Sequence, residues 1–179
     1  MNWKIISSQY ILKHNYFTAR KDICQMPDGT IVDPYFVVEL PTSVCAVAVT
    51  SDNKIILVKQ YRHPLADTIL ELPGGFMDEG EDESEAIARE LLEETGFSFS
   101  QYRYLGKVAA NPGILNNYTH LYLALGGTKI ASQDLDANEQ IETAFYSLEE
   151  IKKMLQQNEI KQALHVSCLY YALLQPDLQ

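Results

Sequence analysis

The chain has 179 residues, enough for a domain with a substantial core, and 46% of them are hydrophobic. Its formal net charge of -10 argues against the broad basic surface that binding to nucleic acids usually requires. The sequence contains no apolar run long enough to span a bilayer and no apolar segment after a basic start, so we expect a soluble, cytoplasmic protein with neither nucleic-acid nor membrane partners.

The first forty residues predict β-strands. The segments YFTARKDIC and TIVDPYFVVEL flank QMPDGT, in which Asp28 and Gly29 supply a turn that accepts positive φ, and together they predict a hairpin. Pro41 then breaks the pattern. We therefore expect a small β-rich N-terminal element at residues 1–41 and the main domain at 42–179.

The next segments predict the sheet and helices of the main domain. Two apolar runs, SVCAVAVT and KIILVKQY, are typical of central strands that are buried on both faces. Further strands are predicted at YRYLGKVAA, THLYLAL and QIETAFYS. A helix is expected from about Glu83 to Thr95, another from the capping box of Ser147 and Glu150 through Leu155, and a last one over about 160–174. This order predicts an α/β (α+β) fold with a mixed sheet sandwiched between helices.

The cysteines are too scattered to form a disulfide framework. Cys24, Cys45 and Cys168 have apolar neighbours and show no CxxC or Cys/His ligand spacing. We expect reduced thiols in the core or at the surface.

The first predicted helix carries an unusual concentration of acid. Residues 78–94 hold nine acidic side chains and one arginine, so this segment contributes -8 of the net -10. Glu90 and Glu94 share a helix face, where a pair of like charges destabilises the helix by about 0.2–0.5 kcal/mol. Arg89 can offset part of this repulsion by gripping a neighbouring carboxylate. An acidic face in solvent would be the ordinary explanation, and a site for a hard divalent cation is the functional one.

The spacing of these residues favours the metal site. From Gly75 the sequence reads GFMDEGEDESEAIARELLEETGF, and it fits a pattern with nine defined positions in 23 residues. The nine are Gly75, Glu81, Arg89, Glu90, Leu91, Glu93, Glu94, Gly96 and Phe97. This segment resembles the Nudix box, which binds Mg²⁺ or Mn²⁺ and supports hydrolysis of a nucleoside diphosphate linked to another group.

The resemblance implies a role for each matching residue. Glu90 and Glu94 would be the principal metal ligands, with Glu93 a further ligand or catalytic helper. Glu81 and Arg89 would orient them, and the carbonyl oxygen of Gly74 would be another metal ligand. The expected cofactor is Mg²⁺, with Mn²⁺ as a possible substitute.

The flanking segments resemble one branch of the family. LVKQYRHP and LELPGG are similar to the QYR and ELPAG segments of the ADP-ribose and nucleoside diphosphate sugar pyrophosphatases, although Gly74 stands where alanine is common. Pro112, 16 residues beyond Gly96, resembles the proline of ADP-ribose hydrolases. The usual form is S-P-G followed by an acid, whereas here Asn111 comes before and Asn116 and Asn117 come after. Another nucleoside diphosphate sugar therefore stays open as the substrate, as does a simple turn at Pro112.

Three further expectations concern the reaction. In this branch the general base is often a glutamate after the box, and LDANEQIETAF offers Glu139, the better match, and Glu142. Either could also be an ordinary loop residue. Arg62 is a candidate for contacting the diphosphate or the sugar, with a surface arginine as the alternative. The histidines have no ligand spacing and are expected to be structural.

The resemblance also implies a homodimer, because the N-terminal segment of this branch commonly crosses to a second subunit. The sequence predicts a divalent-metal-dependent enzyme that cleaves ADP-ribose or a related nucleoside diphosphate sugar to a nucleoside monophosphate and a sugar phosphate. Two alternatives remain: a pyrophosphatase that removes unwanted nucleoside triphosphates, and a non-catalytic domain that binds nucleotide sugars.

Overall fold

The computed structural model describes residues 1–14 and 16–178, and its internal contacts divide the chain into two compact units. The first unit contains Met1–Thr42 together with Ala109–Tyr118, and the second contains Ser43–Val108 and Thr119–Gln179. Among the described residues, no helix is long and apolar enough to cross a membrane.

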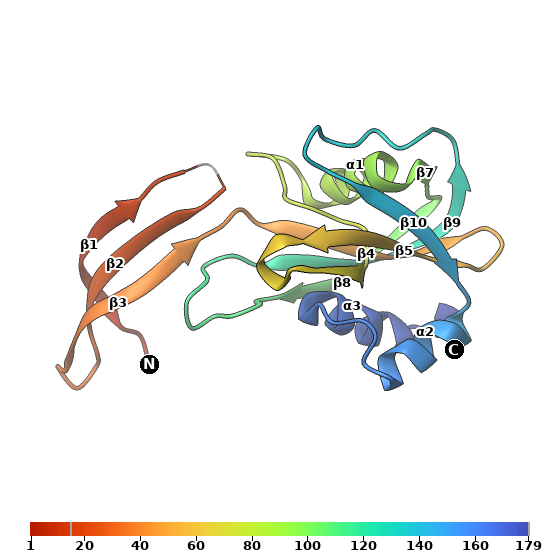
Figure 1. Ribbon diagram of the computed structural model, residues 1–179. Coiled ribbons are helices and arrows are strands. Elements are labelled where there is room, and N and C mark those ends of the chain that lie inside the picture. The colour runs from red at the N-terminus through yellow and green to blue at the C-terminus, as the bar shows by residue number, and fades with distance from the viewer. Residues whose placement is uncertain (15, 179) are drawn as a thin grey trace. The chain divides into compact units, whose positions relative to one another are not determined.

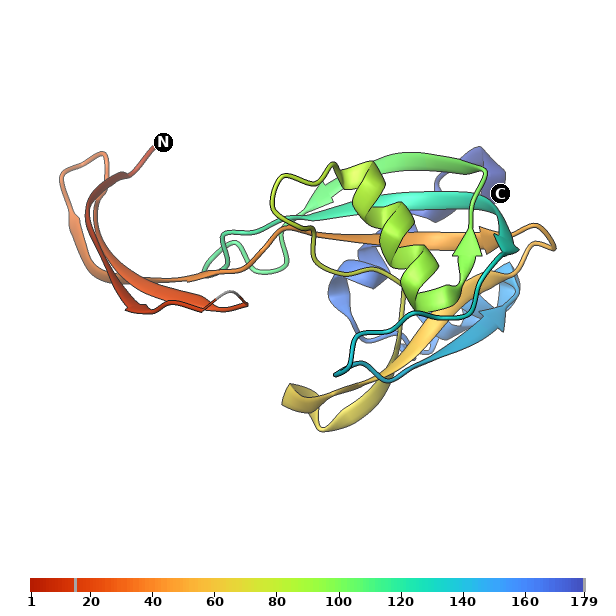
Figure 2. The same cartoon turned by 90° about the horizontal axis from the view of Figure 1, so that it is seen from above.

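The first unit is built on a three-stranded antiparallel sheet in the order β1-β2-β3, which is curved along its length (Figure 2). The predicted hairpin is present, since β2 and β3 are joined by a turn in which Gly29 has a φ of 90°. A third strand, β1, extends it beyond the prediction. The strands are β1 (Lys4–Leu12), β2 (Thr18–Gln25) and β3 (Ile31–Glu39).

The segment 109–118 packs on β3 and the residue that follows it through backbone and side-chain hydrogen bonds. The Val38 amide donates to the carbonyl of Ile114 at 2.8 Å, and the Tyr35 hydroxyl donates to that of Gly113 at 2.9 Å. Asn116 accepts from the Leu40 amide through its side-chain oxygen at 3.2 Å. The asparagine that departs from the family pattern therefore holds backbone within this unit.

The second unit is a seven-stranded mixed sheet between helices. Its order is β10-β5-β4-β9-β7, with β6 also paired to β5 and β8 to β9; β4 and β9 are parallel and the other pairs antiparallel. The strands are β4 (Ser43–Thr50), β5 (Ile55–Arg62), β6 (Asp67–Glu71), β7 (Phe97–Ser98), β8 (Gln101–Val108), β9 (Thr119–Lys129) and β10 (Ile141–Tyr146).

Helices cover both faces of this sheet, so the predicted fold class is confirmed (Figure 1). One apolar cluster joins the sheet to α1 (Glu83–Thr95), for which Ala86, Ile87 and Leu91 are fully buried. The other joins the opposite face to α2 (Leu148–Gln156) and α3 (Ala163–Leu173). All three cysteines are free and buried.

Two predicted elements differ from the structure. The last helix begins at Ala163 rather than near residue 160, because the Gln162 side chain caps it by accepting from the Leu164 amide at 2.6 Å. Strand β5 is buried on both faces only in its first half. After Ile56 it leaves β4 and pairs instead with β6, so Lys59, Tyr61 and Arg62 reach solvent.

Candidate active site

Helix α1 has the predicted bounds, and its ends are fixed by local hydrogen bonds. Asp82 caps the start by accepting from the Ser84 amide at 2.9 Å. At the other end Gly96 has a φ of 74°, which favours glycine, and its amide donates to the carbonyl of Leu92 at 2.8 Å. The apolar face packs on the sheet, and Glu90 and Glu94 lie at its edge: Glu94 is buried and Glu90 is partly buried.

Arg89 donates all five of its N–H groups to protein acceptors, four of them to acidic side chains. Nε and Nη2 donate to the two carboxylate oxygens of Glu81 at 2.8 and 2.9 Å, and Nη1 donates to Glu90 at 2.9 Å and to Glu93 at 3.0 Å. The remaining Nη2 proton goes to the carbonyl of Phe76 at 3.1 Å. A guanidinium has no further donors, so Arg89 acts as a brace within the protein. Glu85, four residues before Arg89 on the same helix, is not among these acceptors.

Glu94 is held by a glycine that lies 20 residues earlier in the chain. The Gly74 amide donates to Oε2 of Glu94 at 2.8 Å. Next to it, the Val44 amide donates to the carbonyl of Gly75 at 2.9 Å, which pins this segment to β4. A Cβ on Gly75 would lie 2.6 Å from Oε1 of Glu90. A side chain at position 75 would therefore push the Glu90 carboxylate out of its present place.

The two predicted principal ligands have raised pKa values. Burial, first, and the nearby acids raise the pKa of Glu90 to about 7, against the opposing effect of Arg89. Burial is also the main cause for Glu94, where it raises the pKa to about 8 although the Gly74 amide opposes the shift. The charge of Glu139 contributes to both shifts, so these three carboxyl groups lie within electrostatic reach of one another.

These side chains line one acidic cavity with a volume of about 340 Å³. Its walls are formed by the following residues: Asp78, Arg89, Glu90, Glu93, Glu94, Asp134, Leu135, Asp136 and Glu139. Glu142 is not among them, because it lies on β10 opposite Lys59, 3.8 Å from its Nζ. The structure thus brings Glu139, and not Glu142, to the predicted metal ligands.

The loop that carries Glu139 is fastened to the end of α1. The side-chain amide of Gln133 donates to the carbonyls of Glu94 at 2.6 Å and Ile141 at 3.2 Å, and the Asp134 amide donates to the carbonyl of Glu93 at 2.9 Å. Asp134 and Asp136 were not predicted as site residues. The only signal for them was the short acidic segment DLDANE.

The donor set fits a hard divalent cation. It consists of carboxylates around one polar cavity, which are the groups that Mg²⁺ prefers. Among residues 1–14 and 16–178, however, no three acidic, histidine or cysteine side chains already converge as a metal cluster. Glu90 is engaged by Arg89, and Glu94 by the Gly74 amide.

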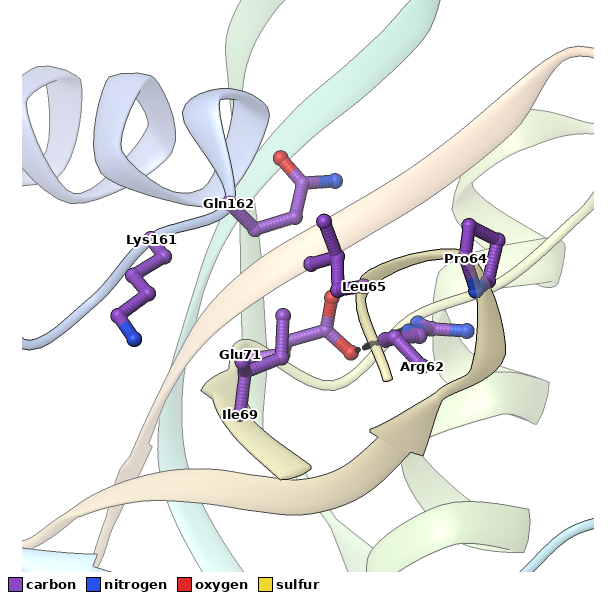
Figure 3. Close-up of a pocket in the computed structure, with 7 residues that line it drawn as sticks. All are labelled: Arg62, Pro64, Leu65, Ile69, Glu71, Lys161 and Gln162. Atoms are coloured by element: carbon purple, nitrogen blue, oxygen red, sulfur yellow. Dashed lines mark hydrogen bonds and ion pairs between the residues drawn. The ribbon is translucent and has the colours of Figure 1, made fainter. Parts of the chain in front are cut away.

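Arg62 lies in a second cavity of about 260 Å³ beside the turn between β5 and β6 (Figure 3). Its Nε donates to Oε2 of Glu71 at 2.8 Å, and its Nη2 is 2.7 Å from the same oxygen. Glu71 is almost fully buried and was not singled out from the sequence, although it lies within the LELPGG segment.

Pro112 belongs to the segment 109–118 of the first unit.

Histidine 165 has a structural position, as expected. It is buried on α3, and its Nδ1 accepts from the Leu72 amide at 3.1 Å. The His120 side chain is also largely buried, with 15% of its surface exposed, and its Nδ1 lies 3.9 Å from a carboxylate oxygen of Glu83.

Comparisons with known proteins agree with this arrangement. The family model of the NUDIX domain matches residues 39–165, and that of the nucleoside diphosphate sugar hydrolase N-terminal domain matches residues 3–38. The chain is 32% identical to the methanol dehydrogenase activator of Bacillus methanolicus over 98% of this chain and 95% of that protein. It is 29% identical to the ADP-ribose pyrophosphatase of Bacillus subtilis, with the same coverage.

A solved structure supports the fold. The crystal structure of an ADP compounds hydrolase superposes with a TM-score of 0.84 at 22% identity, covering 96% of this chain and 92% of that one.

Proposed function

This chain belongs to the Nudix hydrolase family, in the branch that carries a nucleoside diphosphate sugar hydrolase N-terminal domain, and we propose that it hydrolyses the pyrophosphate bond of ADP-ribose or a related nucleoside diphosphate sugar. The products would be a nucleoside monophosphate and a sugar phosphate. The observation that carries the proposal is the acidic cavity in which Arg89 braces Glu81, Glu90 and Glu93 while Gly74 holds Glu94.

The family uses divalent metals, and Mg²⁺ is the proposed cofactor here, with Mn²⁺ as a substitute. Glu90, Glu94, Glu93 and the carbonyl oxygen of Gly74 would hold it. When bound, the cation supplies positive charge against the diphosphate and promotes deprotonation of the attacking water. The raised pKa values of Glu90 and Glu94 support this assignment, because carboxyl groups crowded in a buried cavity are stabilised as anions by a cation.

Glu139 is the proposed general base. A base must reach the proton that it removes, and Glu139 lines the same cavity as the proposed ligands. Glu93 supports the reaction as a further ligand or helper, and Arg89 keeps the acids in place. Arg62 and Pro112 are the proposed substrate contacts, with the Arg62 guanidinium suited to phosphate oxygens.

The proposed assembly is a homodimer formed through the N-terminal element, residues 1–41. Large apolar side chains of this unit are exposed in the single chain: Trp3, Ile5, Ile6, Tyr10, Ile11, Leu12, Tyr16, Phe17, Ile31 and Phe36. Exposed apolar side chains in such numbers are typical of an interaction surface.

The function is tested with a substrate panel of ADP-ribose, ADP-glucose, GDP-mannose, UDP-glucose, diadenosine polyphosphates and dNTPs, with Mg²⁺, Mn²⁺ or a chelator. We expect metal-dependent release of a nucleoside monophosphate from at least one nucleotide sugar. Release of inorganic pyrophosphate from dNTPs alone would instead establish the triphosphate reaction. Binding of ADP-ribose without hydrolysis under any metal condition would establish the non-catalytic alternative.

The metal site is tested with Glu94→Gln, using Glu85→Gln as the matched control on the same helix. Glu85 is exposed and lines neither cavity. We expect Glu94→Gln to lower kcat more than about a hundredfold while the protein stays folded, because several kcal/mol of charge stabilisation are lost at about 1.4 kcal/mol per tenfold. Glu85→Gln should keep the wild-type rate. A wild-type rate in Glu94→Gln would contradict the ligand role.

A further inference from the structure

Two arginines of the second unit use their donors in different ways. Arg89 spends all five N–H groups on protein acceptors. Arg62 contacts a single oxygen, Oε2 of Glu71, through Nε and Nη2. The described part of the chain offers Arg62 no other acceptor. Nη1 and one proton of Nη2 are therefore free, and Figure 3 shows a terminal nitrogen turned away from Glu71.

The free donors have the geometry that phosphate recognition requires. Neighbouring N–H groups of a guanidinium form a planar fork that matches two phosphoryl oxygens. Arg62 keeps 43% of its side chain exposed, whereas the Glu71 side chain is only 2% exposed. The carboxylate therefore grips the guanidinium from the protein side and leaves the fork open on the solvent side.

Stability alone gives no reason for a buried acid at Glu71. Removing a carboxylate from water is costly, and replacing a buried ion pair by apolar side chains is often neutral or stabilising. The neighbouring polar group His165 does not need the carboxylate either, because its Nδ1 bonds to the Leu72 amide. A role in holding Arg62 explains why an acid stands among apolar residues such as Ile69.

The acid directly opposite Arg62 is engaged in another ion pair. Asp67 is the residue directly opposite Arg62 in the β5–β6 ladder, and its carboxylate could capture the fork. Instead Asp67 Oδ2 lies 3.4 Å from Nζ of Lys161, at the edge of the same cavity. Arg62 is thus paired with the buried Glu71 and not with the exposed Asp67, although Asp67 is its direct neighbour in the ladder.

The segment that follows Glu71 leads to the acidic cavity. Gly74, three residues later, bonds to Glu94. The residue that holds Arg62 and the residue whose amide holds a proposed metal ligand are therefore three positions apart in one segment.

We propose that Glu71 is a positioning residue that fixes the Arg62 guanidinium in advance, so that its free fork binds a phosphoryl group of the nucleoside diphosphate sugar. This inference rests on the proposed function. Its physical basis is preorganisation: a long side chain that is already held loses less rotamer freedom on binding, and the gain appears as affinity.

The test compares Glu71→Gln and Glu71→Leu with wild type on the best substrate of the panel. We expect KM to rise about tenfold, equivalent to about 1.4 kcal/mol, while kcat changes less than about twofold, because the grip on substrate weakens and the metal site is untouched. In an Arg62→Ala background, Glu71→Gln should cause no further rise in KM. Asp177→Asn, which breaks the pair between Arg103 and Asp177, is the control and should leave KM unchanged.

Thermal unfolding separates positioning from a merely structural role. A lowered midpoint with an unchanged KM in the Glu71 variants would overturn the proposal, as would an additive effect in the Arg62→Ala background. A second arm uses Lys161→Met, which frees Asp67: KM should rise, and adding Asp67→Asn should restore it. Failure of that restoration would contradict the shielding by Lys161.

If wild type hydrolyses no member of the panel, the proposed function fails, but the positioning role is still measured. Calorimetric titration with inorganic pyrophosphate then serves as the probe. Weaker binding by Glu71→Gln than by wild type and Asp177→Asn would support the role, and equal binding by all three would overturn it.

Discussion

His165 shows how burial controls a single titratable side chain. Its imidazole lies in the core on α3, where Nδ1 accepts from the Leu72 amide. Burial, and then the charge of Arg62, lower the pKa of His165 to about 3. The native protein therefore holds this histidine neutral at a pH where an unfolded chain would protonate it.

The pH dependence of stability follows from that difference. Because the native pKa is lowered, His165 binds its proton in the unfolded state from about pH 6.5 downward but in the native state only near pH 3. Its contribution to stability is complete above pH 6.5 and is lost as the pH falls through this window. We expect the gap in unfolding midpoint between wild type and His165→Asn to narrow from pH 7.5 to pH 4.5. A constant gap over this range would contradict the assignment.

The two candidate bases give a second test at the residue scale. Glu139 lines the acidic cavity, while Glu142 faces Lys59. We expect Glu139→Gln to lower kcat by about 10²–10⁴-fold, the usual contribution of general base catalysis, and Glu142→Gln to change it little. Steady-state kinetics at saturating metal decides between them, and the reverse order would assign the base to Glu142.

Individual residues differed in how far the sequence revealed them. The helical spacing of Arg89 and Glu93 predicts their contact, because neighbours on a helix are three and four residues apart. The contacts of Arg89 with Glu81, which lies before the helix, and with the adjacent Glu90 do not follow from this spacing. Glu71 and the link between Gly74 and Glu94 depend on contacts between separate segments. No local pattern reveals these contacts, so they had to come from the structure.

At the scale of elements, the connection from β6 to α1 is the most constrained. Gly74 has a φ of 147°, and a Cβ on it would overlap the carbonyl of Val44. Alanine is common at this position in the family branch, but in this backbone only glycine fits. The same connection delivers the amide that holds Glu94.

Substitution of this glycine should affect both stability and activity. We expect Gly74→Ala to lower the free energy of unfolding by more than about 1 kcal/mol, and to lower turnover, because the amide of Gly74 must shift away from Glu94. Gly80→Ala is the matched control, since Gly80 also has positive φ, at 82°, but nothing lies near its added Cβ. Urea denaturation measures the stability of both variants, and steady-state kinetics measures their turnover. Equal losses of stability and turnover in the two variants would show that the positive φ, and not the contact with Val44, causes the effect.

Element boundaries were predictable where short-range signals act. Helix α1 ends at Thr95 with Gly96 as its cap, and α2 begins after Ser147, which forms a capping box with Glu150, both as predicted. The start of α3 was displaced because Ile160, fully buried, packs into the core from the preceding loop and Gln162 provides the cap. Apolar content alone could not separate that loop from the helix.

At the scale of the whole molecule, the mixed sheet between helices followed from the order of predicted elements. The grouping of segment 109–118 with the N-terminal strands did not, because it joins parts of the chain that are far apart in sequence. In a single chain, strand β1 leaves all nine of its residues exposed. An exposed strand with this many apolar residues is expected to pair or pack with another surface.

We therefore expect the protein to have twice the mass of one 20.3 kDa chain in solution. Ile11→Glu should convert it to a monomer, because a charge on β1 would have to be buried in the interface. Leu174→Glu, at another exposed apolar position, is the matched control and should leave the dimer intact. Analytical ultracentrifugation measures the masses, and a monomeric wild type would contradict the proposed assembly.

The burial of the cysteines makes this protein well suited to chemical labelling. Cys24, Cys45 and Cys168 are at most 7% exposed, so in the folded protein thiol-reactive dyes should meet little background. A single Asn138→Cys substitution, at an exposed position beside Glu139, would then carry the only readily accessible thiol. A fluorophore there would report, in real time, whether the loop fastened by Gln133 moves when a nucleotide sugar binds.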